Sequence, residues 1–421
     1  MLSDDVMFHR CVAGFGLFMM IALAWLLSSE RRKFPWRVVG GGLLLQLVLV
    51  ALILKTDQGQ QVFRSLGQAF NGMLGFVDGG CALIFGDNFA EHYFAFRVLP
   101  SIVFFSSLMA VLYHLGVMQF VVRILGKVLQ KTLGTSGAES LSAAANIFVG
   151  QTEAPFVVRP YIPSMTQSEL MAIMTGGFAT VAGGVMAMYV GYGIDAAHLI
   201  TASVISAPAG LLIAKVILPE TEPPVTSGST DGMVDVGTSN LIEAATHGAS
   251  EGLKLALNVA AMLIAFMALI AMIDYLLVHA SFWLMHSVLK LDVQQGLTLG
   301  TIFGYAFSPL AWLMGIPWKD CLPAGELLGL KMAANEVIAY QRLRDMTVGE
   351  PGDWLISPRT RIIMTYALSG FSNFASIGIQ VGGIGGLCPE RRPELARLGL
   401  RAMLGGTLAC CMTACVAGVF V

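Results

Sequence analysis

The sequence predicts an all-α integral membrane protein with about eight transmembrane helices, two re-entrant helical hairpins and an inverted-repeat core. Three observations lead to this fold class. The composition is apolar, long apolar runs recur along the chain, and two similar stretches place a carboxylate in the middle of an apolar segment. Hydrophobic residues make up 56% of the 421 residues and charged residues 12%, whereas soluble domains carry about 25% charged residues. Lipid is therefore the main solvent expected for this chain.

Charge and motif content argue against several function classes. The formal net charge of −2 provides no basic surface for nucleic acid. The seven cysteines lack metal-binding spacing, and the histidines form no HExxH pattern. The sequence contains neither a GxSxG motif nor a Walker loop. We therefore expect no enzymatic activity and no resident cofactor.

Apolar runs long enough to cross hydrocarbon lie throughout the chain. The first run follows Asp4 and Asp5 rather than basic residues, so we interpret it as a retained helix and not as a signal peptide. The basic clusters at 31–37, 123–131 and 391–401 are expected in loops on the cytoplasmic side of an inner (plasma) membrane, with both termini outside. Spans are predicted near residues 8–28, 37–55, 97–118, 167–192, 196–217, 253–278, 360–384 and 398–420.

Two apolar stretches carry charged and amide side chains at their middle. The stretch 138–162 contains Gln151 and Glu153, and 324–346 contains Asn335 and Glu336. We predict that each belongs to a re-entrant hairpin. The apolar run 297–318 would be the leading arm of the second hairpin, which then covers 297–346. Exposed backbone at a hairpin tip is tolerated only where protein or a watery cavity surrounds it, so both tips should point toward a central site.

These elements recur in the same order in two halves. Each hairpin precedes an interrupted span, which contains Gly177-Phe-Ala-Thr180 in the first half and Gly370-Phe-Ser-Asn373 in the second. The first unit has three crossings, an odd number, so the second unit should run the opposite way. Inverted repeats with discontinuous helices are typical of secondary transporters. The predicted organisation is N-terminal membrane helices (1–95), a first repeat (96–218), a polar connector with an amphipathic segment (219–252) and a second repeat (253–421).

Several motifs make a family resemblance specific. Asn146-Ile-Phe-Val-Gly-Gln-Thr-Glu-Ala-Pro155, followed by Val158-Arg-Pro-Tyr161, resembles the first-hairpin signature of the concentrative nucleoside transporters. The stretches 177–183, 198–208 and 370–378 resemble the same family in the same order, so the similarity covers roughly residues 95–421. The resemblance implies a bacterial, sodium-coupled member that imports nucleosides by symport and forms a homotrimer.

The resemblance also implies which residues bind the substrate. Gln151, Thr152 and Glu153 would face the nucleobase, and Val185 and Phe371 would contact it. Glu336, Asn373 and Ser376 would hold the ribose. Independently of the family, a carboxylate at the bilayer centre costs several kcal/mol and usually has a function. The alternative is that Glu153 and Glu336 form structural ion pairs with Arg159 or Arg342.

The family's sodium site maps onto Asn146, Val149, Thr180 and Val181. An unwound turn would supply carbonyl oxygens from the last three residues beside the Asn146 side chain. The alternative role for Asn146 and Thr180 is to cap helix ends. Retention of the motifs at 146–155 and 179–183 favours the sodium-coupled branch over the proton-coupled one.

Three further alternatives stay open at this point. An intramembrane enzyme could use Glu153 and Glu336 as an acid and base pair. A channel or receptor would lack coupling, and a proton-coupled symporter could use either carboxylate as the proton carrier. Among substrates we expect pyrimidine nucleosides. We also hypothesise purine nucleosides, because Gly183 and Gly184 would leave room for a larger ring system in the base pocket.

Overall fold

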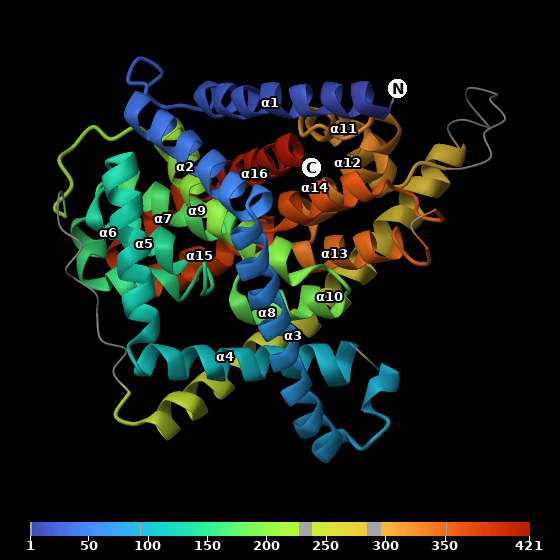
Figure 1. Cartoon of the computed structure of the whole chain (residues 1–421), viewed down its shortest axis with the longest axis horizontal. Coiled ribbons are helices and arrows are strands. Elements are labelled where there is room, and N and C mark those ends of the chain that lie inside the picture. The colour runs from blue at the N-terminus through green and yellow to red at the C-terminus, as the bar shows by residue number, and fades with distance from the viewer. Residues whose placement is uncertain (1, 93, 227–237, 284–295, 351) are drawn as a thin grey trace.

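The computed structural model describes residues 2–92, 94–226, 238–283, 296–350 and 352–421, and every regular element in these ranges is helical (Figure 1). The N-terminal part contains α1 (Leu2–Leu26), α2 (Trp36–Lys55), α3 (Asp57–Phe85), η1 (Phe89–His92) and η2 (Phe94–Val98). The first half contains α4 (Leu99–His114), α5 (Val117–Leu133), α6 (Gly137–Ala145), η3 (Ala154–Ser164), α7 (Gln167–Ala179), α8 (Gly183–Gly191) and α9 (Ala196–Ile217). The second half contains α10 (Leu241–Trp283), α11 (Leu299–Leu313), α12 (Trp318–Ala333), α13 (Glu336–Asp345), α14 (Pro358–Leu368), α15 (Phe374–Leu387), η5 (Pro389–Arg391) and α16 (Arg392–Phe420).

The membrane-spanning character of the fold follows from these helices. Seven helical stretches in the described part of the chain are long and apolar enough to cross a bilayer, and they coincide with seven of the eight predicted spans. The remaining prediction, 360–384, corresponds to two short helices, α14 and α15, separated at residues 369–373. Seven of the eight predicted spans are therefore confirmed, and the eighth is divided into two short helices at the predicted interruption.

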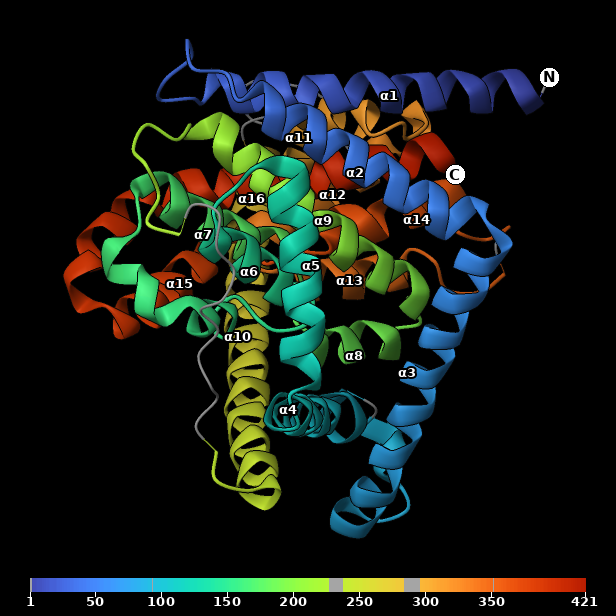
Figure 2. The same cartoon turned by 60° about the vertical axis from the view of Figure 1, so that its left-hand side comes forward.

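The helices differ sharply in how much protein surrounds them. Figures 1 and 2 show α1 along one edge of the molecule and α4 along the opposite edge, with α7, α9 and α16 between them. In the most apolar stretch of α9, 89% of the residues are buried, whereas in the most apolar stretch of α10 only 11% of the residues are buried. The buried helices therefore form the core that carries the hairpins, and α10 presents apolar side chains outward.

The structure corrects three expectations about connecting segments. Arg123, Lys127 and Lys131 lie on α5 and not in a loop, because Met118, Val122 and Leu129 give this segment a buried apolar face at helical spacing. The polar segment before residue 253 is continuous with the following span, since α10 begins at Leu241. Residues 227–237 of the predicted connector lie outside the described residues.

The third correction concerns the second hairpin. The run 297–318, predicted as its leading arm, forms α11, and the arm that leads into α13 is α12. The axes of α11 and α12 differ by 117°. Gly315, at a φ of +82°, and Pro317 lie at this bend, where glycine tolerates the left-handed backbone and proline cannot continue the preceding helix.

Buried polar contacts hold each hairpin at its base. In the first half, capping boxes begin both α6 (Ser136 and Glu139) and α7 (Thr166 and Glu169), and Ser136 Oγ donates to Glu169 at 2.6 Å. In the second half, buried Asp320 of α12 accepts hydrogen bonds from Ser357 and Thr360 at the start of α14. Each hairpin arm is thus joined to the start of the interrupted span that follows it.

Lys215 of α9 completes the contacts at the base of the first hairpin. Its ammonium lies 2.7 Å from Glu139 and 3.1 Å from Glu220, and its side chain is 4% exposed. Lys215→Met should destabilise the protein by about 3–5 kcal/mol, because Glu139 would be left as a buried charge without its counter-ion. Thermal unfolding in detergent measures this loss. Lys254→Met, which removes an exposed ion pair with Glu251, is the control, and equal melting temperatures for the two variants would contradict the prediction.

Candidate functional site

The two interrupted spans meet at their breaks. Gly370, in the break between α14 and α15, lies against the end of α7, where a Cβ atom at this position would be 2.6 Å from the Phe178 carbonyl oxygen. Glycine is therefore required for the close approach of the two backbones. Helix ends with free backbone groups from both halves consequently lie together inside the protein.

The tip of the first hairpin contacts the interrupted span of the second half. Gln151 Nε2 donates to Ser376 Oγ at 3.2 Å, and Gln151 Oε1 accepts from Gln380 Nε2 at 2.9 Å. Gln380 also donates to the Met174 carbonyl of α7 at 3.1 Å. Both Ser376 and Gln380 lie on α15, one helical turn apart, so α15 presents a polar edge to this tip.

The tip of the second hairpin contacts both interrupted spans. Glu336, 4% exposed, is the first residue of α13. Its Oε1 accepts a hydrogen bond from Tyr189 Oη of α8 at 3.2 Å, and its Oε2 accepts one from Asn373 Nδ2 at 3.0 Å. The carboxylate is thus held by two donors, and each oxygen keeps a second lone pair for a further hydroxyl donor.

These contacts form one continuous chain of hydrogen bonds. Asn373 Oδ1 accepts from the Ser376 backbone N–H at 2.9 Å, which connects the Gln151–Ser376 contact to the Asn373–Glu336 contact. The structure therefore brings together four of the predicted substrate residues: Gln151 from the predicted base group, and Glu336, Asn373 and Ser376 from the predicted ribose group. The contacts between the two halves follow the same pattern. The tip of the first hairpin contacts α15, and the tip of the second hairpin contacts α8, so each tip contacts the second helix of the other half's interrupted span.

Glu153 stands apart from this chain of hydrogen bonds. Its side chain is exposed, and it takes no part in the hydrogen bonds that join the two tips. Phe371 lies partly exposed in the break after α14, whereas Val185 is 3% exposed on α8.

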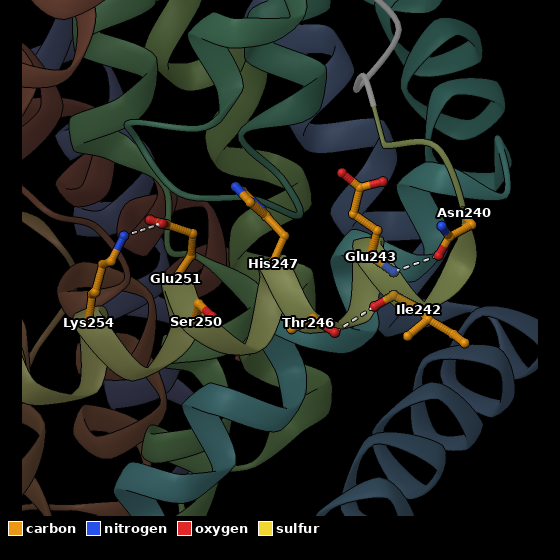
Figure 3. A pocket seen from close by; sticks show the side chains of 8 residues that line it. All are labelled: Asn240, Ile242, Glu243, Thr246, His247, Ser250, Glu251 and Lys254. Carbon is orange, nitrogen blue, oxygen red and sulfur yellow. Dashed lines mark hydrogen bonds and ion pairs between the residues drawn. The ribbon is translucent and has the colours of Figure 1, made fainter.

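A solvent-open pocket lies along the first turns of α10 (Figure 3). Its volume is about 590 Å³. Glu243, His247 and Glu251 recur every four residues and so share one face of the helix, and Glu251 pairs with Lys254 in Figure 3. The pocket is therefore lined by the polar face at the start of α10.

The ion-pair alternative for the two hairpin carboxylates finds no support in the described residues. Arg342 forms an ion pair with Glu326 at 2.9 Å and not with Glu336. No ion pair between Arg159 and Glu153 occurs among those residues. The carboxylates are thus not neutralised by the arginines that sequence reasoning weighed against a functional role.

The four predicted sodium ligands lie near the ends of α6 and α7. Asn146 follows the last residue of α6, and a Cβ at Gly176 in α7 would be 3.4 Å from Asn146 Nδ2. The Gly183 N–H donates to the Phe148 carbonyl at 3.0 Å, which brings the turn holding Val149 beside the break holding Thr180 and Val181. The four residues therefore share one region between the first hairpin and α7.

Asn146 and Thr180 both occupy C-cap positions, of α6 and α7, but only Thr180 uses its side chain there. Thr180 Oγ1 donates to the Gly176 carbonyl at 2.9 Å at the end of α7. The side-chain oxygen and nitrogen of Asn146 are both buried without a hydrogen-bond partner in the described structure. Leaving such groups unpaired costs about 1–3 kcal/mol, so we expect a bound cation or hydrogen-bond donor to contact the amide oxygen. A hard cation such as sodium fits an amide oxygen and backbone carbonyls.

Gly183 and Gly184 do not open a pocket, contrary to expectation. A Cβ at Gly183 would be 2.9 Å from the Phe148 carbonyl, and one at Gly184 would be 3.3 Å from Ser106 Oγ of α4. These glycines allow α8 to approach the first hairpin and α4 closely. They therefore give no support to the purine hypothesis.

Gly150 offers a direct test of the position of Glu153. A Cβ at Gly150 would collide with Glu153 Oε2, so Gly150→Ala should displace the carboxylate. We expect uptake of the transported solute to fall about tenfold or more, the effect of losing roughly 1.4 kcal/mol of binding. Initial uptake rates in proteoliposomes measure it.

The matched control for this variant is Gly382→Ala, where a Cβ on α15 would meet nothing within 4 Å. Gly382→Ala should keep its uptake, and alanine is the better helix former. Equal uptake by the two variants would show that the Glu153 carboxylate needs no fixed position.

Sequence reasoning missed two residues of this region: Tyr189 and Gln380. Gln380 could have been found as an amide within the apolar segment after the second interruption. Tyr189 gave no such signal, because a tyrosine in an apolar span is more often part of the core.

Three family models match the chain. They are described as "Na+ dependent nucleoside transporter N-terminus" (residues 15–88), "Nucleoside recognition" (residues 95–195) and "Na+ dependent nucleoside transporter C-terminus" (residues 198–418).

Two curated relatives and one solved structure show the extent of the similarity. The chain is 46% identical to an uncharacterized transporter of Haemophilus influenzae over 96% of each chain. It is 43% identical to human solute carrier family 28 member 3, over 96% of this chain and 59% of that longer protein. The structure of CNTnw in an inward-facing substrate-bound state has a TM-score of 0.89 at 43% identity, covering 99% of this chain and 98% of that one.

Proposed function

The chain belongs to the family of concentrative, Na+-dependent nucleoside transporters, which are multi-pass membrane proteins and not enzymes, and we propose on this premise that it imports nucleosides by symport with sodium. One observation carries the proposal. A chain of hydrogen bonds from Gln151 to Glu336 joins the two hairpin tips at the breaks of both interrupted spans. Such a polar centre among apolar helices suits a polar solute that cannot cross lipid unaided.

The ribose half of the substrate suits the second hairpin. Ribose hydroxyls both donate and accept, and Glu336 offers acceptor lone pairs beside the Asn373 amide. Ser376 extends this surface toward the first hairpin. Because a ligand without the hydroxyl leaves a desolvated carboxylate unpaired, deoxyribose analogues should bind more weakly.

The base half of the substrate suits the first hairpin. Gln151 and Thr152 provide donors and acceptors for a base edge, and the accessible Glu153 adds an acceptor. Phe371, partly exposed in the break after α14, can stack on an aromatic ring. Val185 of α8 is assigned to the apolar wall of the same pocket.

Sodium is assigned to Asn146, Val149, Thr180 and Val181. The partnerless Asn146 amide supports this assignment. One imported monovalent cation gains about 2.3 kcal/mol from a 100 mV potential and about 1.4 kcal/mol from a tenfold gradient. Together these suffice to concentrate a neutral nucleoside several hundredfold.

The decisive experiment compares two driving forces. Purified protein in proteoliposomes should accumulate uridine under an imposed sodium gradient and not under an imposed pH gradient. Accumulation under the pH gradient alone would show that protons, and not sodium, drive the uptake. If uridine only equilibrated across the membrane, the protein would be a channel or facilitator. If the protein altered the nucleoside chemically, the enzyme alternative would be favoured.

Substrate range and assembly are tested separately. We propose that pyrimidine nucleosides are accepted, so uridine should be taken up, and inhibition of this uptake by excess adenosine or inosine would extend the range to purines. We also propose a homotrimer. The apolar surface of α10, whose most apolar stretch is 11% buried in the single chain, is available for contact with lipid or a second subunit. The mass of the detergent-solubilised particle checks this assembly.

A further inference from the structure

Gln380 of α15 is a buried amide beside the tip of the first hairpin. Its side chain is 0% exposed. Its NH2 group donates to the Met174 carbonyl of α7 at 3.1 Å and to Gln151 Oε1 at 2.9 Å. A backbone carbonyl can only accept a hydrogen bond. The Gln380 amide must therefore turn its nitrogen, and not its oxygen, toward Met174.

The orientation of Gln380 in turn determines the orientation of Gln151. The same NH2 group of Gln380 also faces Gln151, so the Gln151 atom that meets it must be the acceptor oxygen. The Gln151 nitrogen then lies on the other side of its amide, where it donates to Ser376 Oγ at 3.2 Å. The fixed carbonyl of α7 thus sets the orientation of two amides in series.

The packing around the two amides is close. A Cβ at Gly177 of α7 would be 2.8 Å from Gln380 Nε2 and 2.9 Å from Gln151 Cβ. Gly177 is the first residue of the Gly177-Phe-Ala-Thr180 interruption. The absence of a side chain at this position lets both glutamines lie against the backbone of α7. The two amides are therefore held between α7 and the first hairpin tip.

Gln151 consequently offers a hydrogen-bond donor to a ligand. Its NH2 group has two N–H bonds, and Ser376 Oγ accepts one of them. Among the described residues, no acceptor is bonded to the other. A ligand group that fits this N–H is an acceptor such as a carbonyl oxygen, and not an amino group.

We propose that Gln380 is a positioning residue that holds the Gln151 amide with its N–H toward the nucleobase, so that the site selects bases with a carbonyl acceptor at this edge. This inference rests on the proposed function, because it takes Gln151 as a base-binding group. Gln380 is fully buried and acts through Gln151. Without Gln380 the Gln151 amide can turn over, since the Ser376 hydroxyl both donates and accepts.

The test compares three nucleosides in the wild type and in Gln380→Met, whose side chain has a similar volume but no N–H donor. The nucleosides are uridine, the analogue without the C4 oxygen of the base and the analogue without the C2 oxygen. The wild-type KM for one analogue should exceed the KM for uridine about tenfold, because the Gln151 N–H loses its acceptor. In Gln380→Met the KM for uridine should rise to that of this analogue, whose own KM should change little. Initial uptake rates in proteoliposomes under a sodium gradient provide these values.

Gln46→Met is the matched control, since Gln46 of α2 is an equally buried amide that donates to Gly42 of its own helix. This variant should keep the wild-type ratio of KM values. A rise of all three KM values by the same factor in Gln380→Met would overturn the inference alone, and so would equal wild-type KM values for the three nucleosides. Absence of uridine uptake by the wild type would overturn the proposed function and this inference with it.

Gln380→Glu covers the case in which Gln380→Met does not fold. A carboxylate at this position accepts a hydrogen bond from the Gln151 amide, so Gln151 would turn its oxygen toward the base. Uridine should therefore lose its advantage over the same analogue in this variant too. An advantage that persists in either folded variant, or failure of both variants to fold, would contradict a role of Gln380 in orienting Gln151.

Discussion

Glu336→Gln should abolish nucleoside uptake, with a fall in kcat/KM of about 100-fold or more. The substitution keeps the size of the side chain but replaces one acceptor oxygen with an NH2 donor. That donor must face either Asn373 Nδ2 or Tyr189 Oη, which both donate to the carboxylate. Hydrogen bonds to a charged group contribute about 1.5–3 kcal/mol each, so losing one or two at the ribose explains the size of the effect.

Uptake of uridine under a sodium gradient measures this loss, and thermal unfolding verifies that the variant is folded. Glu326→Gln is the matched control, because Glu326 belongs to the neighbouring α12 and pairs with Arg342 at the protein surface. Glu326→Gln should transport at nearly the wild-type rate. Normal uptake by Glu336→Gln would remove this residue from the binding site.

Asn146→Leu should raise the sodium concentration for half-maximal uptake by about tenfold or more. Leucine has a similar volume but no oxygen, so one ligand of the assigned sodium site is lost, at a cost of at least about 1.4 kcal/mol. The loss is not offset by other contacts, because the Asn146 amide has no hydrogen-bond partner in the described structure. The maximal rate at saturating sodium should change less than the half-saturating concentration.

Sodium titration of uridine uptake at a fixed membrane potential provides the measurement. Ser142→Ala is the control, since Ser142 Oγ is also buried without a partner and lies one turn earlier on α6. If Ser142→Ala shifted the titration and Asn146→Leu left it unchanged, the ligand set would be wrong.

Asn146 and Glu336 lie in neighbouring parts of the region around the two hairpin tips. Asn146 begins the turn that ends in Gln151, and Gln151 is joined through Ser376 and Asn373 to Glu336. We infer that a cation beside Asn146 orders the turn that presents Gln151 to the base. If sodium and a nucleoside bind as proposed, both would stabilise the same conformation of the tip, and sodium binding would favour nucleoside binding.

Local features of the sequence were sufficient to predict the spans and to single out the two hairpin carboxylates. A run of about 20 apolar residues has few alternatives to a membrane helix, and a glutamate within such a run is costly without a role. The same reasoning failed at α5. There the charges lie on one face of a helix, a pattern that resembles a polar loop when only composition is considered.

Sequence patterns did not predict contacts between residues that lie far apart in the chain. Tyr189 lies 147 positions from Glu336, and Gln151 lies 229 positions from Gln380, so no local spacing signals either contact. The roles of Gly183 and Gly184 were misjudged for the same reason, since the side chains that approach them belong to other elements.

The sequence by itself determined which segments lie in the membrane, where the glutamates of the two hairpins lie in the chain, and the order of the repeated elements. These features depend on the hydrophobicity and spacing of neighbouring residues. The tertiary structure alone decided which groups complete the site: Tyr189 and Asn373 converge on Glu336 because the breaks of two interrupted spans pack together. Burial and mutual distance decide what a polar group does inside a membrane protein, and both are properties of the packed helices.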